Sequence, residues 1–391
     1  MTKKSIRTKT VPSAGAGEPD WGSDGRRSAR SQAEADANGP SPFAAILLEW
    51  YDRHARVLPW RVSPDDLRRG VRPDPYRVWM SEIMLQQTTV AAVKSYFAAF
   101  TERWPDVASL AAAEDAEVMG AWAGLGYYAR ARNLLACARV VASDRNGVFP
   151  TTAEALSELP GVGDYTSAAI AAIAFDEPVA VVDGNIERIS TRIAAIETPL
   201  PAARKAIREL VGTLTPRLRP GDFAQAMMDL GATICTPRRP ACVLCPVTDH
   251  CEARRLGRQE EFPVKLAKKA KPARRGAVFV LRRRSDGAVW LRRRPPTGML
   301  GGMSEPPSSA WSSKGDGALG KEAAPIEAAW HLAGFVEHGF THFDLTLEVW
   351  SAQADTMPPI EGWWATPAQL EGEALPTLMR KVIERSAAPI A

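Results

Sequence analysis

The sequence predicts a multidomain protein, in which an all-α domain is followed by a smaller α+β domain. Between Pro42 and about Arg255, alanine-rich segments are separated by proline and glycine, and strand signals are nearly absent. After about residue 276 the pattern changes, because two short β-type runs flank Asp286 and Gly287, a pair that favours a tight hairpin turn. Four cysteines near the end of the helical part indicate a metal or cluster site.

Length and composition limit the classes of protein to consider. The 391 residues leave room for two or three domains, and the 45% content of hydrophobic residues is enough to form buried cores. No apolar run approaches the length of a membrane span, and residues 1–9 lack the apolar stretch of a secretory signal, so we expect a cytoplasmic protein. The net charge is only +4, so any binding to nucleic acid must come from local patches.

Composition also suggests where the domains end. Residues 1–40 are rich in small and charged side chains and have almost no large apolar ones, so we expect a disordered tail. Residues 257–275 combine many lysines and arginines with two prolines, which is typical of an extended basic linker between domains. These boundaries leave residues 41–256 as the helical domain and residues 276–388 as the α+β domain.

The cysteine run has the spacing C-x6-C-x2-C-x5-C at Cys235, Cys242, Cys245 and Cys251. Thiolates bind soft metals, and the Cys242 and Cys245 pair lets one turn offer two sulfurs to one centre. Disulfides are disfavoured because no secretory signal is present and the fifth cysteine, Cys137, lies far upstream. Spacing alone favours an iron–sulfur cluster and leaves zinc open, since zinc sites usually combine two short pairs of ligands.

A glycine-containing junction between two helices is a candidate phosphate-binding site. Gly161, Val162 and Gly163 lie between a helix that is predicted to end near Leu159 and another that is predicted to start near Asp164. Backbone N–H groups that are left open at such a junction can bind a DNA phosphate at the N-terminus of the following helix. An ordinary helical hairpin turn is the alternative.

Taken together, the hairpin sequence at residues 159–163, the Val-Asp-Gly-Asn sequence at residues 182–185 and the cysteine run resemble the helix-hairpin-helix DNA glycosylases of the endonuclease III superfamily. Further stretches are similar to the adenine DNA glycosylase (MutY) branch, at residues 81–88, 124–133 and 223–231. The resemblance extends from about residue 43 to about residue 383. The long N-terminus and an insertion-like stretch at residues 63–72 depart from the family pattern.

The resemblance implies a monofunctional glycosylase of base excision repair, which hydrolyses the N-glycosidic bond of adenine mispaired with 8-oxoguanine or guanine. It implies one 4Fe-4S cluster, held by the four cysteines in a loop at residues 235–251. The expected partner is double-stranded DNA with such mispairs, bound by a monomer that associates with a bacterial-type nucleoid. The alternatives are a related glycosylase for thymine in G·T pairs or for oxidised pyrimidines, a non-catalytic lesion binder, and a phosphohydrolase of oxidised nucleotides.

Two carboxyl groups suit the expected chemistry. Adenine is a poor leaving group as an anion, so its departure calls for protonation, and the apolar neighbours of Glu82 could keep a proton on its carboxyl group near neutral pH. The resemblance also assigns Glu82 as the general acid; a solvent-exposed glutamate on an amphipathic helix is the alternative. Asp183 could stabilise the positive charge left on the sugar, with Asn185 bonding a carboxylate or positioning water, although Asp183 could also simply cap a helix.

Tyr165 discriminates between two kinds of glycosylase. In the bifunctional relatives, a lysine at this point attacks the sugar as an amine, which forms a Schiff base and leads to strand cleavage. A tyrosine cannot form an imine, but its hydroxyl group can bond the catalytic carboxylates. We therefore expect a product strand with an intact abasic site.

The resemblance also assigns residues to DNA and base contacts. Gln87 and Tyr127 match positions that wedge into the duplex beside the orphaned base, although Tyr127 could instead pack in the core. The Gln225 amide can donate to and accept from the N6 and N7 edge of adenine. The residues that match positions of the adenine pocket are Leu58, Trp60, Arg61 and Gln225.

Residues 276–388 resemble a MutT-like (Nudix-fold) domain, most clearly at residues 293–302. No run of glutamates follows that could hold magnesium, so we expect a recognition domain and not a phosphohydrolase. Phe340, Thr341 and His342 match the turn that senses 8-oxoguanine in the family, with threonine replacing serine. The hydroxyl group is retained, so a hydrogen bond to the damaged base is expected. The alternative is a turn of strand-like core phenylalanines with a solvated histidine.

Overall fold

The computed structural model describes residues 40–266 and 270–387. The disordered tail predicted for residues 1–40 lies, apart from its last residue, outside the described part of the chain. The described residues from Ser41 onward form one compact unit. In the described segments, no helix combines the length and the apolar character that crossing a bilayer requires.

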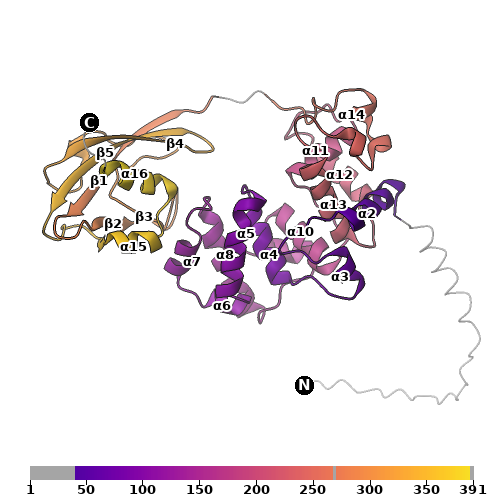
Figure 1. Cartoon of the computed structure of the whole chain (residues 1–391), viewed down its shortest axis with the longest axis horizontal. Helices are drawn as coiled ribbons and strands as arrows, with labels where there is room; N and C mark the ends of the chain where they lie inside the picture. Colours follow the sequence, from indigo (N-terminus) through magenta and orange to yellow (C-terminus); the bar gives the residue numbers. More distant parts are fainter. Residues whose placement is uncertain (1–39, 267–269, 388–391) are drawn as a thin grey trace, which may run out of the picture. The chain divides into compact units, whose positions relative to one another are not determined.

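The described residues up to 256 fold mainly into α-helices joined by loops (Figure 1). Several starts follow directly from the sequence, since Ser41, Ser63 and Asp74 each accept a hydrogen bond from a backbone N–H of the following turn, and a proline follows each of them. The elements are α2 (Pro42–His54), α3 (Pro64–Arg68), α4 (Pro75–Leu85), α5 (Val90–Arg103), α6 (Val107–Ala111), α7 (Asp115–Ala121), α8 (Ala129–Asp144), α9 (Ala153–Ser157), α10 (Asp164–Phe175), α11 (Gly184–Ile193), α12 (Arg204–Leu214), α13 (Pro220–Thr233), η1 (Cys242–Leu244), η2 (Thr248–His250) and α14 (Glu252–Arg255).

Two hydrophobic cores hold these helices together. One gathers around Trp79 and Trp122 and the other around Tyr51 and Phe223, and all four side chains are buried. Burial of such large aromatic side chains is a main source of stability. Helix α10 packs against α4 of the first core and against α13 of the second, and its first turn carries Tyr165. The junction of the two cores therefore fixes the place of Tyr165.

The C-terminal domain is a mixed sheet with helices (Figure 1). Its strand order is β3-β2-β1-β5-β4, with β6 also paired to β2; β1 and β5 run parallel, and the other pairs are antiparallel. Helix α16 packs against β1, β4 and β5, and its Met379 is fully buried among their apolar side chains. The elements are β1 (Ala273–Arg283), β2 (Val289–Arg293), β3 (Ser304–Glu305), η3 (Lys321–Ala323), β4 (His331–Gly339), β5 (Asp344–Ala354), β6 (Trp363–Ala365), α15 (Pro367–Gly372) and α16 (Thr377–Ala387).

The hairpin predicted around Asp286 and Gly287 is present between β1 and β2. Gly287 has a φ of 71°, a conformation that glycine adopts without strain, and Asp286 Oδ1 accepts a hydrogen bond from the backbone N–H of Ala288 over 3.1 Å. The two strands pair in the antiparallel sense. Local turn chemistry was sufficient to predict this element.

The segment at residues 257–275, predicted as an extended linker, is folded at both ends. Phe262 is only 2% exposed, and the backbone N–H of Leu200 donates to the carbonyl group of Val264 over 3.1 Å. At the other end, β1 already begins at Ala273. The basic composition of the segment predicts an extended chain, but the burial of Phe262 outweighs the tendency of its charged neighbours to stay solvated.

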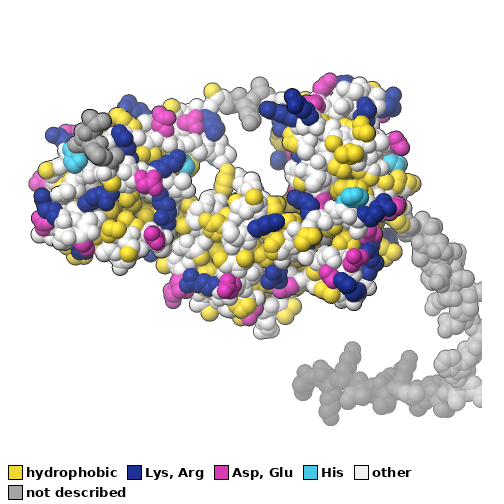
Figure 2. Space-filling model, in the orientation of Figure 1, with side chains coloured by type: hydrophobic (Ala, Val, Ile, Leu, Met, Phe, Trp, Pro, Cys, Tyr) yellow, Lys and Arg dark blue, Asp and Glu magenta, His cyan; other side chains and the backbone are white. Residues whose placement is uncertain are grey.

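Charged side chains of both signs are intermixed on the face of the molecule that Figure 2 shows. Some pair directly, as Arg103 does with Glu117 over 2.6 Å and Arg139 with Asp115 over 2.7 Å. Such a surface agrees with the small net charge of the chain. Nucleic-acid binding still has to be argued from individual sites.

Candidate active site

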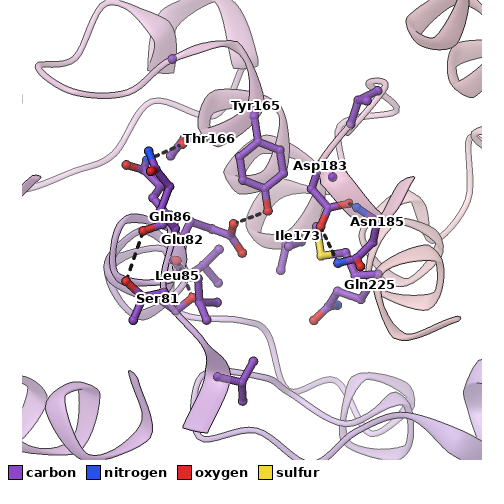
Figure 3. Close-up of a pocket in the computed structure, with 18 of the residues that line it drawn as sticks. Ser81, Glu82, Leu85, Gln86, Tyr165, Thr166, Ile173, Asp183, Asn185 and Gln225 are labelled. Atoms are coloured by element: carbon purple, nitrogen blue, oxygen red, sulfur yellow. Dashed lines mark hydrogen bonds between the residues drawn. The ribbon is translucent and has the colours of Figure 1, made fainter. Parts of the chain in front are cut away.

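A cavity of about 900 Å³ is lined by residues of α4, α10, α11 and α13 and of the loop between α2 and α3. Figure 3 shows the side chains of Glu82, Tyr165 and Asp183 pointing toward one another in this cavity. The predicted site residues that line it are Leu58, Trp60, Arg61, Glu82, Gln87, Gly161, Gly163, Tyr165, Asp183, Asn185 and Gln225. The fold therefore gathers into one cavity residues from five distant parts of the sequence.

Glu82 lies on α4 with only 5% of its surface exposed. Burial raises the pKa of its carboxyl group to about 7; Asp183 adds to this increase, whereas Tyr165 and Arg61 oppose it. The alternative that Glu82 faces solvent on an amphipathic helix is therefore wrong. A carboxyl group with this pKa holds a proton in a large fraction of molecules at neutral pH, as a general acid must.

Tyr165 is the second residue of α10, and its hydroxyl group donates a hydrogen bond of 2.6 Å to Oε2 of Glu82. Burial raises the pKa of Tyr165 well above its usual value, and the neighbouring carboxyl groups of Glu82 and Asp183 raise it further. The phenol therefore stays neutral and acts as a donor. A phenol, and not the amine of a lysine, therefore stands beside the carboxyl groups of Glu82 and Asp183.

Asp183 is the N-cap residue of α11, so the capping role considered for it is confirmed. Its Oδ1 accepts from the backbone N–H groups of Asn185 and Ile186 over 2.9 and 2.7 Å, and its Oδ2 accepts from Nδ2 of Asn185 over 2.9 Å. Burial raises the pKa of Asp183, while these hydrogen bonds lower it. The helix N-terminus also favours a negative charge here. Capping thus fixes the carboxylate in the cavity.

A chain of hydrogen bonds connects Asp183 to the cysteine loop. Asn185, which donates to Asp183, accepts through Oδ1 from Nη2 of Arg188 over 3.0 Å. The same guanidinium group donates to the carbonyl oxygens of Gly231, over 2.7 Å, and of Cys235, over 2.8 Å. Helix α11 therefore begins at the cavity carboxylate, Asp183, and also carries Arg188, whose guanidinium group contacts the backbone of Cys235.

The cysteine loop brings Cys235, Cys242, Cys245 and Cys251 around one small cavity, and none of them forms a disulfide. Four thiolates around one cavity are the donor set of an iron–sulfur cluster and also of a structural zinc site, so the side chains present fit either group.

Comparison with known proteins agrees with these features. Residues 80–214 match the family model described as HhH-GPD superfamily base excision DNA repair protein, residues 235–251 match the iron-sulfur binding domain of endonuclease III, and residues 277–385 match the NUDIX domain. The adenine DNA glycosylase of Homo sapiens is 36% identical over 401 residues, which cover 87% of this chain and 73% of the human protein. This chain belongs to the adenine DNA glycosylase family.

Other similar proteins include a second adenine DNA glycosylase and a solved structure. The adenine DNA glycosylase of Mycolicibacterium smegmatis is 42% identical over 211 residues, which cover 54% of this chain and 69% of that protein. The structure of a thermostable thymine-DNA glycosylase has a TM-score of 0.49 and 30% identity, and the match covers 58% of this chain and 99% of that one.

Family membership confirms several predictions. The fold class is a helical helix-hairpin-helix domain with an iron–sulfur loop, followed by a Nudix-like α+β domain. The four cysteines are those of the family's iron–sulfur domain, and one 4Fe-4S cluster is the cofactor. Among the alternatives, zinc and disulfides are therefore excluded.

In the Nudix-like domain of this adenine DNA glycosylase family member, the carboxylate that follows the matched stretch at residues 293–302 is already paired. Glu305 is 1% exposed, and both Arg292, at 2.9 Å, and Arg294 form ion pairs with it. A carboxylate held between two guanidinium groups is not free to bind magnesium. This arrangement argues against the alternative of a nucleotide phosphohydrolase.

The residues predicted to contact DNA lie at the surface of the fold. Gln87 and Tyr127 have φ angles of 56° and 49°, a left-handed conformation that is uncommon for such side chains, and Tyr127 is 46% exposed. The alternative that Tyr127 packs in the core is wrong. Its hydroxyl oxygen lies 3.1 Å from Oγ1 of Thr341, and a second cavity, of about 540 Å³, is lined by residues that include Gln87, Tyr127, Phe340, Thr341 and His342.

The turn after β4 has two kinds of residue. Phe340 stacks on the buried Phe343, with ring centroids 4.7 Å apart, and its N–H donates to the carbonyl group of Phe343 over 2.9 Å. Thr341 and His342 are exposed. The alternative of a core phenylalanine beside a solvated histidine describes this packing well, and the side chains of Thr341 and His342 are still accessible to a ligand.

The hairpin before α10 has the expected geometry. Gly161 has a φ of 74°, and a side chain there would collide with Asn133, whose Cβ lies 2.5 Å from the position of an added Cβ. Gly163 is the N-cap residue of α10 and has no side chain to bond the open N–H groups of that turn. Val162 differs from the glycines, since its side chain is buried and packs in the core.

Sequence reasoning missed three charged residues around the cavity. Asp229 pairs with Arg56 and with Arg61, and Arg188 connects Asn185 to Cys235. Asp229 falls inside the matched stretch at residues 223–231, and that was the only signal available for it. The partners of Asp229 lie 173 and 168 residues away, and Cys235 lies 47 residues from Arg188, so no local pattern could have identified these contacts.

Proposed function

We propose that this chain removes adenine opposite 8-oxoguanine, and less well opposite guanine, from double-stranded DNA by hydrolysis, leaving an intact abasic strand. The observation that carries the proposal is the hydrogen bond of 2.6 Å from Tyr165 to Glu82, with Asp183 facing both groups. It supplies an acid and a carboxylate in one cavity without a nucleophilic amine. A bifunctional pyrimidine glycosylase would need an amine where Tyr165 stands, and a passive lesion binder would have no use for a buried, protonated Glu82.

Glu82 would act as the general acid. The proton on its carboxyl group passes to N7 of adenine as the bond between C1′ and N9 breaks, so the electron pair of that bond leaves with a neutral base. The amide of Gln225, which is 4% exposed and lines the same cavity, would bond the N6 and N7 edge of adenine. The target nucleotide must leave the base stack to reach this depth.

Asp183 would stabilise the positive charge that develops at C1′. Its three hydrogen bonds fix the carboxylate, and the N-terminus of α11 favours its ionised form. Water then adds to C1′ and returns one proton to the carboxylate of Glu82, which completes hydrolysis. The cluster held by the four cysteines would supply structural support for the loop at residues 235–251, and no acid or base for this reaction.

Recognition of the mispair would involve the exposed residues around the site. Gln87 and Tyr127 would enter the gap beside the orphaned base, while Thr341 and His342 would contact the 8-oxoguanine. The N–H groups around Gly163 would bind a DNA phosphate at the start of α10. We expect the protein to bind the duplex as a monomer.

The test uses duplexes that contain adenine opposite 8-oxoguanine, adenine opposite guanine, thymine opposite guanine, and thymine glycol. Alkali then reveals abasic sites, and borohydride reveals covalent trapping. We expect alkali-dependent cleavage of the two adenine duplexes, almost none with Glu82→Gln, and no efficient trapping. Adenine release that is unaffected by Glu82→Gln, or trapping as efficient as that of a lysine enzyme, would contradict the mechanism. Release of thymine or thymine glycol in preference to adenine would contradict the substrate assignment.

A further inference from the structure

The loop between α2 and α3 supplies three of the residues that line the adenine-pocket side of the cavity, Leu58, Trp60 and Arg61. This loop has no regular secondary structure to hold it. Its main internal support is a hydrogen bond of 3.0 Å from the backbone N–H of Arg61 to the carbonyl group of Leu58. Its position must therefore depend on contacts with other parts of the fold. Leu58 and Trp60 pack in the first hydrophobic core, and Arg77 donates to the carbonyl group of Pro59 over 3.2 Å.

The two arginines that flank these residues are held by one carboxylate. Oδ1 of Asp229 accepts from Nε of Arg56 over 2.6 Å and from Nη1 of Arg61 over 2.9 Å. Its Oδ2 accepts from the backbone N–H of Arg56 over 2.9 Å and from the same Nη1 over 2.8 Å. Asp229 is 0% exposed, so water cannot replace these bonds. The carboxylate thus binds both the backbone N–H and the side chain of Arg56 at the start of the segment 56–61. At the end of the segment it binds the guanidinium group of Arg61.

We propose that Asp229 is a positioning residue for adenine recognition, which fixes the loop at Arg56 and at Arg61 and thereby aims the Arg61 guanidinium group into the cavity. The inference rests on the proposed function, since it concerns how the same cavity receives its base. Asp229 does not line the cavity; Gln225, one helical turn earlier on α13, does. One face of α13 therefore contacts the cavity directly through Gln225 and supports it indirectly through Asp229.

Asp229 also controls the charge of the site. The Arg61 side chain is 8% exposed, and its neighbours with titratable groups are Tyr51, Asp229 and Glu82. The groups that face Glu82 are Tyr165, Asp183 and Arg61. Without the carboxylate, the positive charge of Arg61 would be unbalanced beside Glu82 and would favour the ionised form of that acid. An enzyme that needs Glu82 protonated would then lose activity at a lower pH.

The experiment compares Asp229→Asn with a matched control, Asp222→Asn, in the full-length holoenzyme. Asp222 is another buried aspartate of α13 that pairs with an arginine, Arg219 at 2.8 Å, but it does not line the active cavity. For each variant we would measure cluster absorbance, thermal unfolding, and single-turnover excision of adenine opposite 8-oxoguanine between about pH 5 and pH 9, a range that brackets the raised pKa of Glu82.

We expect Asp229→Asn to lower the excision rate by about tenfold or more at neutral pH and to move the basic limb of the pH profile downward by about half a unit. Asp222→Asn should stay within about threefold of the wild type and keep its pH limb. A pH limb and rate for Asp229→Asn that match those of Asp222→Asn would overturn the inference. Failure of the wild type to release adenine would instead overturn the proposed function.

A double-mutant cycle separates positioning through Arg61 from a general effect on folding. In the background of Arg61→Gln, the further change Asp229→Asn should lower the rate by less than about twofold. If the two residues had independent structural roles, the rate losses of the two single variants would multiply in the double variant. If Asp229→Asn does not load its cluster, Arg56→Gln tests the same anchor, because its side chain is 28% exposed and less critical for folding. A fall of about threefold or more would support the inference, and an unchanged rate would overturn it.

Discussion

The hydroxyl oxygen of Tyr165 lies 2.6 Å from Oε2 of Glu82, and the hydroxyl group is the donor. Because the pKa of Tyr165 is far above neutral, its proton stays on the phenol. The bond therefore occupies one carboxyl oxygen of Glu82 and leaves the other to carry the proton that a base would receive. A lysine in this position would be a competing nucleophile, whereas the phenol only orients the acid and adjusts its pKa.

Tyr165→Phe should move the basic limb of the pH profile for adenine excision to higher pH. The hydrogen bond from Tyr165 lowers the pKa of Glu82, so its removal raises that pKa and keeps the acid protonated over a wider range. The measurement is the single-turnover rate from pH 6 to pH 9, a range centred about the pKa of a tuned acid. If the basic limb stays at the same pH or moves to lower pH, the hydrogen bond from Tyr165 does not lower the pKa of Glu82.

Glu82→Gln should stabilise the protein above neutral pH. Burial raises the folded-state pKa of Glu82 to about 7, above the pKa of the same group in the unfolded chain. Folding therefore becomes less favourable as the pH rises above the unfolded-state pKa. The gain should be nearly absent below about pH 4.5, grow as the pH rises, and level off above about pH 7 at no more than about 3 kcal/mol. Urea unfolding of both proteins at a series of pH values measures it. A difference that does not depend on pH would contradict the buried, shifted acid.

The sequence was sufficient to predict most of the fold and the residues that converge on the cavity. Glu82, Tyr165 and Asp183 stand in contiguous motifs, and the hairpin at Gly287 follows from local turn chemistry. The same method could not find Asp229, since its role depends on partners 173 and 168 residues away. The prediction of an extended linker was also wrong near Phe262, because the average composition of a segment does not register the burial of one aromatic ring.

Arg188→Gln should reduce both cluster content and the excision rate of the remaining loaded enzyme. Its guanidinium group joins Asn185, which bonds Asp183, to the carbonyl group of Cys235. Loss of a residue that supports both ligands and reacting groups typically costs about tenfold or more in activity. The measurements are cluster absorbance per chain and the single-turnover rate per cluster.

Arg192→Gln is the matched control for that prediction. Arg192 donates to the carbonyl group of Thr236 over 2.8 Å and lies 3.2 Å from Sγ of Cys235, but it makes no hydrogen bond to Asn185. It should therefore lower cluster content and leave the rate per cluster near that of the wild type. Equal losses per cluster in both variants would show that the link through Asn185 has no separate effect on the cavity.

Thr341→Ala should reduce the preference for adenine opposite 8-oxoguanine over adenine opposite guanine by about three- to tenfold, which is the usual worth of one hydrogen bond. Thr341→Ser keeps the hydroxyl group and should retain the preference. The measurement is the ratio of the single-turnover rates on the two duplexes. Because Oγ1 of Thr341 lies 3.1 Å from the hydroxyl oxygen of Tyr127, Tyr127→Phe is needed as a second control. If Thr341 contacts the damaged base directly, Tyr127→Phe should keep the ratio; a matching loss in both variants would mean that Thr341 acts only by holding Tyr127.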